Sequence, residues 1–127
     1  MEFSYSADLV GLKARARELA KKLTVYEDES ERGGGLSPSS REEIKRIVLD
    51  SGFNAMNAPV AWGGAGLNWM QQVVVEEEFG RLTNGLWAAV WRPTAAALTR
   101  STAQQRERYL IPEIPGERFG GRAITEP

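Results

Sequence analysis

Cysteine and histidine are both absent from this sequence of 127 residues. The chain therefore has no disulfide, no thiolate or imidazole ligand for a metal, no cysteine nucleophile and no histidine base for a catalytic triad. These absences exclude most hydrolase chemistry, and we expect no metal site. Long hydrophobic runs are missing too, because stretches such as Val73 to Val75 are far shorter than the roughly 20 apolar residues of a membrane-spanning helix.

Neither sign of charge dominates, because 16 lysines and arginines are balanced by 17 aspartates and glutamates. The net charge of -1 gives no electrostatic reason to expect nucleic acid or an anionic membrane as a partner. The first residues are acidic and polar, unlike a secretory signal. We therefore expect a cytoplasmic or otherwise soluble intracellular protein, with a length that suits one modest domain.

Apolar residues recur three and four positions apart over much of the chain, which is the spacing of amphipathic helices. The first predicted helix opens near Ser6. The second has Ser37 as its cap, Pro38 in its first turn and Gly52 after its last turn. Between them, EDESERGGG breaks the pattern with an acidic run and three glycines, and we interpret it as a mobile loop.

Three more helices are predicted from their capping residues: Asn68 with Gln71, Asn84, and Thr102 with Gln105. Pro93 should kink or end the second of these, and Pro112 should close the last. The apolar stripes of the predicted helices should form a common core that includes Leu12, Leu19, Ile44, Ile47, Met70, Val73, Val74 and Phe79.

The end of the sequence, GGRAITEP, departs from the helical pattern. Arg122 to Thr125 alternates like a short β-strand, yet nothing upstream supplies a partner strand. The predicted fold class is therefore all-α, a helical bundle of about five helices with a short orphan β-strand at the C-terminus.

Two features could belong to a binding site. The loop at residues 63–66 lacks the lysine and the serine or threonine of a phosphate-binding loop and follows no strand, so we interpret it as a structural turn. Trp87 and Trp91 lie four positions apart and share a helix face. They either pack in the core or form one wall of a ligand pocket.

Three consecutive glutamates, Glu76–Glu78, look like a carboxylate cluster. Successive helix positions point about 100° apart, so these side chains cannot converge on one metal ion or substrate atom, and at most one points inward. Arg81 follows Glu77 by four positions and Glu78 by three. We therefore predict an ion pair on the helix surface rather than catalysis.

Several stretches, taken in order, resemble the acyl-CoA dehydrogenase family along nearly the whole chain. GFNAMNAPVAWGGAGL resembles the segment in which a glycine-aromatic pair leads to a proline and a glycine-rich turn, and VVVEEEFGR resembles the next helix. TAQQRERYLIPEIPGERFGGRAITEP is the most specific stretch, because it joins a glutamine- and arginine-rich helix to a Tyr-Leu-x-Pro end, a Gly-Glu turn and Thr-Glu-Pro.

The resemblance implies an architecture and a reaction. In the family, a helical N-terminal domain precedes a middle β-domain and a C-terminal four-helix domain, so residues 1–118 correspond to the helical domain and residues 119–127 begin the β-domain. The complete enzyme dehydrogenates the α,β-bond of an acyl-CoA thioester: a carboxylate takes the α-proton and FAD accepts the β-hydride. Since that carboxylate belongs to the C-terminal domain, no residue here is assigned a catalytic role.

The resemblance also implies site residues and partners. Ala123, Ile124 and Thr125 match the strand that faces the isoalloxazine ring of the FAD cofactor, and Trp87 and Trp91 match a helix at the far end of the acyl pocket. The implied partners of the complete enzyme are an acyl-CoA substrate and an electron-transfer partner, and we expect a homo-oligomer.

Two interpretations from different classes follow. In the first, the chain is the N-terminal part of an FAD-dependent acyl-CoA dehydrogenase, or of a related flavin oxidase or monooxygenase, and is not catalytic alone. In the second, it is a non-catalytic helical interaction module derived from the family. The orphan strand favours the first, since a stand-alone module has little reason to keep an exposed strand edge.

Overall fold

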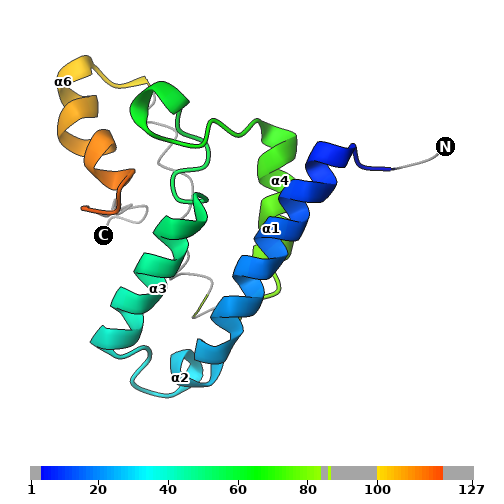
Figure 1. Ribbon diagram of the computed structural model, residues 1–127. Coiled ribbons are helices and arrows are strands. Elements are labelled where there is room, and N and C mark those ends of the chain that lie inside the picture. Colours follow the sequence, from blue (N-terminus) through cyan, green and yellow to red (C-terminus); the bar gives the residue numbers. More distant parts are fainter. Residues whose placement is uncertain (1–3, 84–85, 87–99, 119–127) are drawn as a thin grey trace, which may run out of the picture.

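The computed structural model describes residues 4–83, 86 and 100–118, and all regular structure within these ranges is helical (Figure 1). This confirms the predicted all-α class for the described part of the chain. The predicted strand at residues 122–125 and nearly all of the helix predicted from Asn84 lie outside it. In chain order, the elements are α1 (Ala7–Leu23), η1 (Thr24–Tyr26), α2 (Glu27–Glu31), α3 (Pro38–Ser51), η2 (Val60–Trp62), α4 (Trp69–Phe79), α6 (Ala103–Gln105), η4 (Arg106–Leu110) and η5 (Ile111–Glu113).

The body of the fold consists of α1, α3 and α4. α1 begins directly after Ser6, as predicted, and it packs against both α4 and α3 (Figure 1). α3 has the predicted boundaries: the Ser37 hydroxyl accepts a hydrogen bond from the Ser40 N–H at 3.2 Å, and Gly52 ends the helix at a φ of 75°. Glycine adopts this left-handed conformation without the steric cost that a Cβ brings.

Both predicted capping boxes are confirmed. At the start of α4, the Gln71 N–H donates to the Asn68 side chain at 3.0 Å and the Asn68 N–H donates to the Gln71 side chain at 2.8 Å. Thr102 and Gln105 make the same reciprocal pair before α6. The helical path then continues through the π-helical segment η4 and the 3-10 turn η5, so Pro112 lies inside the last turn rather than closing the helix.

The acidic stretch after α1 was predicted to be a loop, but part of it forms the short helix α2. Glutamates and aspartate in its first turn suit the positive end of a helix dipole. The Glu29 carboxylate also accepts hydrogen bonds from the Ser37 N–H at 2.8 Å and the Ser40 hydroxyl at 2.6 Å, which lower its pKa. The same carboxylate thus ties α2 to the start of α3, which corrects the mobile-loop prediction for Glu27–Glu31.

The main core lies between α1, α3 and α4. Phe53 and Phe79 meet edge to face in it, with ring centroids 5.7 Å apart. Leu12 and Ile47, which were expected to be buried, are half-buried against it. The other core predictions that the structure confirms are Leu19, Ile44, Val74 and Phe79.

The predicted core face of α4 is partly wrong. Met70 and Val73 are 55% and 58% exposed, whereas Val75 and Glu78 are fully buried. The buried face is therefore turned away from Met70 toward Glu78. Sequence reasoning missed this because an apolar stripe is not expected to include a glutamate.

Replacing Gly11 with alanine should stabilise the chain. Gly11 lies within α1, and a Cβ added there meets no heavy atom within 4 Å. Because glycine is a poorer helix former than alanine, we expect a gain of about 0.5–1 kcal/mol in the free energy of unfolding, measured by urea denaturation. Gly52→Ala is the matched control and should destabilise, since its φ of 75° suits glycine. A lower urea midpoint for Gly11→Ala than for wild type would contradict the prediction.

Candidate functional site

The residues predicted to form a flavin and acyl-CoA site lie outside the described part of the chain. These are Ala123, Ile124, Thr125, Trp87 and Trp91. Leu86, which directly precedes Trp87 in the sequence, is described and is fully buried in the main core. Within the described ranges, two polar clusters remain whose geometry bears on function.

The first cluster surrounds Glu78, whose side chain is fully buried where α4 faces α1. Arg17 of α1 binds its carboxylate with two nitrogens: Nε donates to Oε2 at 3.0 Å and Nη2 donates to Oε1 at 2.9 Å. A paired fork of this kind is the strong form of a charge-assisted hydrogen bond. The buried charge is therefore compensated by a residue from another helix.

Two further cations complete the cluster. Arg81 donates from Nε to Oε2 of Glu78 at 2.8 Å, while Lys13 lies 3.7 Å from Oε1 and binds the exposed Glu77 at 2.6 Å. The predicted ion pair of Arg81 is thus confirmed with Glu78, but its carboxylate is buried rather than on the surface. As predicted, at most one of the three consecutive glutamates points inward: Glu78 is buried, whereas Glu76 is half-buried and Glu77 is exposed.

This geometry holds Glu78 in its ionised form. The hydrogen bond from Arg17 is the main influence that lowers the pKa of Glu78, and Arg81 adds to it, whereas burial acts in the opposite direction. A carboxylate with a lowered pKa and both oxygens engaged is a poor general base. We therefore interpret the cluster as a structural junction between α1 and α4.

Glu78→Gln should make the chain's stability less sensitive to acid. A carboxyl with a lowered folded-state pKa stabilises the fold above its ordinary pKa of about 4.3, and this contribution disappears as the pH falls through the folded value. Urea denaturation at a series of pH values should therefore show the largest difference between wild type and variant near neutrality, and convergence in acid. A difference that stays constant across the series would contradict the prediction.

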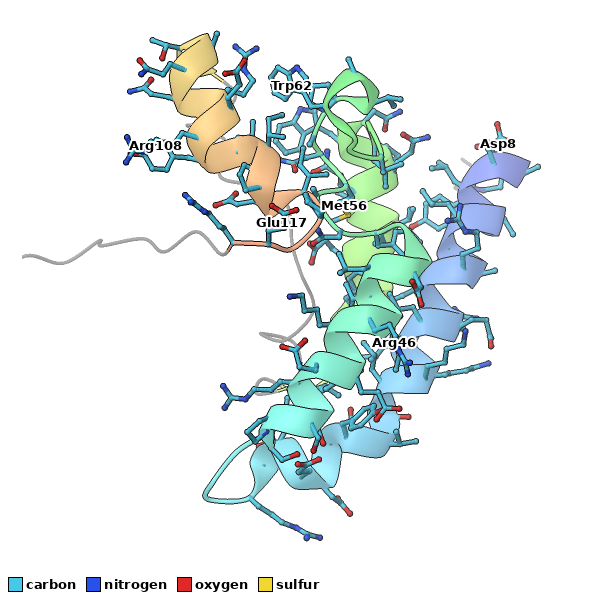
Figure 2. The ribbon with its side chains drawn as sticks, turned by 60° about the vertical axis from the view of Figure 1, so that its left-hand side comes forward. Asp8, Arg46, Met56, Trp62, Arg108 and Glu117 are labelled. Atoms are coloured by element: carbon cyan, nitrogen blue, oxygen red, sulfur yellow. The ribbon has the colours of Figure 1, made fainter. Side chains whose placement is uncertain are left out.

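The second cluster joins the glycine-rich turn to the C-terminal helical segment. Trp62, at the end of η2, and Ile111 both pack against a small buried cluster that includes Ile114. Figure 2 shows Trp62 on the side of the turn that faces the C-terminal helical segment. The Arg106 guanidinium of that segment lies 4.4 Å from the centroid of the indole ring. The Asn54 side chain donates to the backbone carbonyl of Ile114. Sequence reasoning did not predict this cluster, and the only signal for it was an aromatic residue inside the glycine-rich stretch.

The glycine amides of the turn are already engaged and do not point at a ligand. The N–H groups of its three glycines are all donated to nearby carbonyls, in the pairs Gly63 to Val60, Gly64 to Pro59 and Gly66 to Ala58. A phosphate-binding loop instead points such N–H groups at its ligand. This confirms the interpretation of residues 63–66 as a structural turn. Over the described ranges, no group of acidic, histidine or cysteine residues is arranged to hold a metal ion either.

A family model described as acyl-CoA dehydrogenase, N-terminal domain, matches residues 7–117. The chain belongs to the acyl-CoA dehydrogenase family. The match to this N-terminal domain begins at the first residue of α1 and ends in the turn after η5, so it includes both clusters. Within its described residues, this member of the acyl-CoA dehydrogenase family has no helix that is long and apolar enough to cross a membrane.

Individual relatives have related names. The caffeyl-CoA reductase-Etf complex subunit CarC of Acetobacterium woodii is 31% identical over 122 residues, which cover 91% of this chain and 31% of the relative. The mitochondrial isovaleryl-CoA dehydrogenase of Pongo abelii is 30% identical over 132 residues, with 92% and 30% covered. The short-chain-specific acyl-CoA dehydrogenase of Clostridium acetobutylicum is 26% identical over 137 residues, with 100% and 34% covered.

The chain therefore spans about a third of the length of these curated relatives. No solved structure matches it. The activities, substrates and partners of whole acyl-CoA dehydrogenases are accordingly matters of proposal for this chain.

Proposed function

We propose that these residues are the N-terminal part of an FAD-dependent acyl-CoA dehydrogenase, which removes an α-proton and a β-hydride from an acyl-CoA thioester. The observation that carries the proposal is the family match over residues 7–117. The names of the three relatives support the substrate class, because each contains a CoA thioester: caffeyl-CoA, isovaleryl-CoA and acyl-CoA.

In this proposal the chain supplies one side of the flavin and acyl pocket. Ala123, Ile124 and Thr125 contact the flavin, and Trp87 and Trp91 border the acyl chain. Leu86, which directly precedes Trp87 in the sequence, is anchored in the core, and this indirectly supports the role of the tryptophans only. The proton-abstracting carboxylate belongs to a later segment of the family, so the chain alone is not catalytic.

An electron-transfer partner and a homo-oligomeric state complete the proposal. The first is supported by a relative whose name makes it a subunit of an Etf complex. That name also contains the word reductase, which favours a second candidate function: the same chemistry in reverse, with hydride passing from reduced flavin to the β-carbon of an unsaturated acyl-CoA. Anaerobic reoxidation of the reduced flavin by such a thioester, in a product that extends beyond Pro127, would distinguish this direction.

The 127-residue chain alone should bind FAD poorly and show no turnover. A flavin held only by Ala123 to Thr125 would gain a few hydrogen bonds worth about 1 kcal/mol each, which cannot offset the several kcal/mol of lost translational and rotational freedom. Titrating FAD while following its fluorescence measures the first part. Adding an acyl-CoA and an artificial electron acceptor measures the second.

The matched experiment uses the coding sequence that follows Pro127. If it continues the reading frame, the longer product should be yellow with bound FAD and should reduce the acceptor when an acyl-CoA is added. A longer product without flavin would refute the proposed function. Micromolar FAD binding or sustained turnover by the 127-residue chain would refute the proposal that it supplies only one side of the pocket. Attention would then turn to Glu113 as a candidate base, because burial raises the pKa of its carboxyl.

A further inference from the structure

We infer that Glu78 fixes the direction in which the chain leaves α4, in addition to joining α4 to α1. Helices commonly end at a glycine in the left-handed conformation, which turns the chain away from the helix axis. Gly80, which follows α4, has φ and ψ of -63° and -7° and is therefore not such a glycine. The change of direction has to be stabilised by other contacts.

Those contacts converge on Glu78. The Arg81 N–H donates to the Glu78 carbonyl at 3.3 Å, and the Arg81 guanidinium donates to the Glu78 carboxylate at 2.8 Å. Arg81 is thus held to Glu78 through both its backbone and its side chain. Since Glu78 is itself fixed by Arg17, Arg81 is held relative to α1 as well.

The next residues are directed back into the fold. The Leu82 N–H donates to the Phe79 carbonyl at 3.1 Å, and the Leu82 side chain is buried. The Thr83 N–H donates to the carboxylate of Glu27, in α2, at 3.4 Å. Leu86 is then fully buried in the main core. Residues 81–83 therefore leave α4 on a path that begins at Glu78, and Leu86 lies anchored in the core beyond them.

The two roles of the carboxylate can be separated because they use different arginines. Arg17 binds both carboxylate oxygens from α1, whereas Arg81 binds only Oε2. Replacing either arginine leaves the buried Glu78 carboxylate paired with the other one. The side chains of Arg17 and Arg81 are 46% and 60% exposed, so replacing Glu78 leaves no buried cation. Glu78→Gln removes the charge that holds both arginines. Glu77 is the natural control, because it is exposed and pairs with Lys13.

A functional consequence follows if the proposed function holds. Trp87 comes directly after Leu86 in the sequence. Glu78 would then be a positioning residue for the proposed wall of the acyl pocket, acting through Arg81 and without contacting substrate. The path of residues 81–83 does not depend on that function, so it can be tested on the chain without flavin or substrate.

Hydrogen exchange measured by mass spectrometry tests the inference in four variants of the chain at neutral pH. Arg81→Gln should speed exchange in residues 81–83 by about tenfold while α1 keeps its protection. Arg17→Gln should affect α1 first, Glu78→Gln should affect both regions, and Glu77→Gln should affect neither. Arg81→Gln is the decisive variant, since it changes a mostly exposed side chain and should not prevent folding.

Two outcomes of this experiment would overturn the inference. Exchange in residues 81–83 of Arg81→Gln that matches wild type would show that Glu78 does not hold this path. Faster exchange spread evenly over α1, α3 and α4 would show a general loss of stability instead. Binding of FAD or acyl-CoA by the longer product is measured separately, so failure of the proposed function leaves this result unaffected.

Discussion

Val74→Asp should unfold much of the chain, whereas the same change at the neighbouring Val73 should leave its stability almost unaltered. Val74 is fully buried and Val73 is 58% exposed, although both lie in α4. A buried aspartate without a partner combines lost packing with the desolvation of a charge, so we expect a cost of about 3 kcal/mol or more. Small domains are stable by only about 5–15 kcal/mol, so this is a large fraction of the total.

The matched pair isolates the effect of burial. Both variants exchange valine for aspartate inside the same helix, so differences in helix propensity and net charge cancel. Urea denaturation followed by circular dichroism should show a much lower midpoint for Val74→Asp and a shift of at most about 0.5 kcal/mol for Val73→Asp. Equal shifts would mean that Val74 does not lie on the buried face of α4.

Gly64→Ala should have the second largest effect. A Cβ built at Gly64 would lie 2.5 Å from the Cβ of Ala58 and closer still to its carbonyl oxygen. Because both contacts involve rigid parts of Ala58 rather than a flexible side chain, the turn has to shift, and we expect a loss of more than about 2 kcal/mol. Thermal denaturation measures this loss.

Gly34→Ala is the control for the turn, because a Cβ at Gly34 meets nothing within 4 Å. The location of the damage is a second measurement. Since the turn carries Trp62, hydrogen exchange in Gly64→Ala should rise most in the C-terminal segment that packs on it. A variant as stable as wild type would show that the turn can absorb the methyl group and that the close approach is unimportant.

The local features of this fold were predictable from sequence. Ser37, Asn68 and Thr102 each cap a helix through hydrogen bonds to residues three positions away, so neighbouring residues contain all the necessary information. The Glu78–Arg81 pair follows from the same spacing. The family resemblance was likewise carried by short stretches in a fixed order, and the family match confirms it.

The features that were missed depend on distant residues. Glu78 can be buried only because Arg17, 61 positions earlier, compensates its charge. Without that partner a glutamate belongs on the surface, which is why Met70 and Val73 were placed in the core instead. The Trp62 cluster is similar, because Arg106 and Ile114 reach it from a separate part of the sequence. The predicted flavin and pocket residues lie outside the described residues and remain predictions.

The separation of the two apolar clusters has a consequence for how the chain melts. The cluster around Trp62 and Ile114 has no member in common with the main core around Phe79. Contacts that share no partners contribute to stability nearly additively. The losses in unfolding free energy caused by substitutions around Trp62 and around Phe79 should therefore sum when combined. Residues 100–118 should open as a cooperative unit of their own while α1, α3 and α4 remain folded. Substitutions that loosen this segment should then leave the hydrogen-exchange protection of α1, α3 and α4 unchanged.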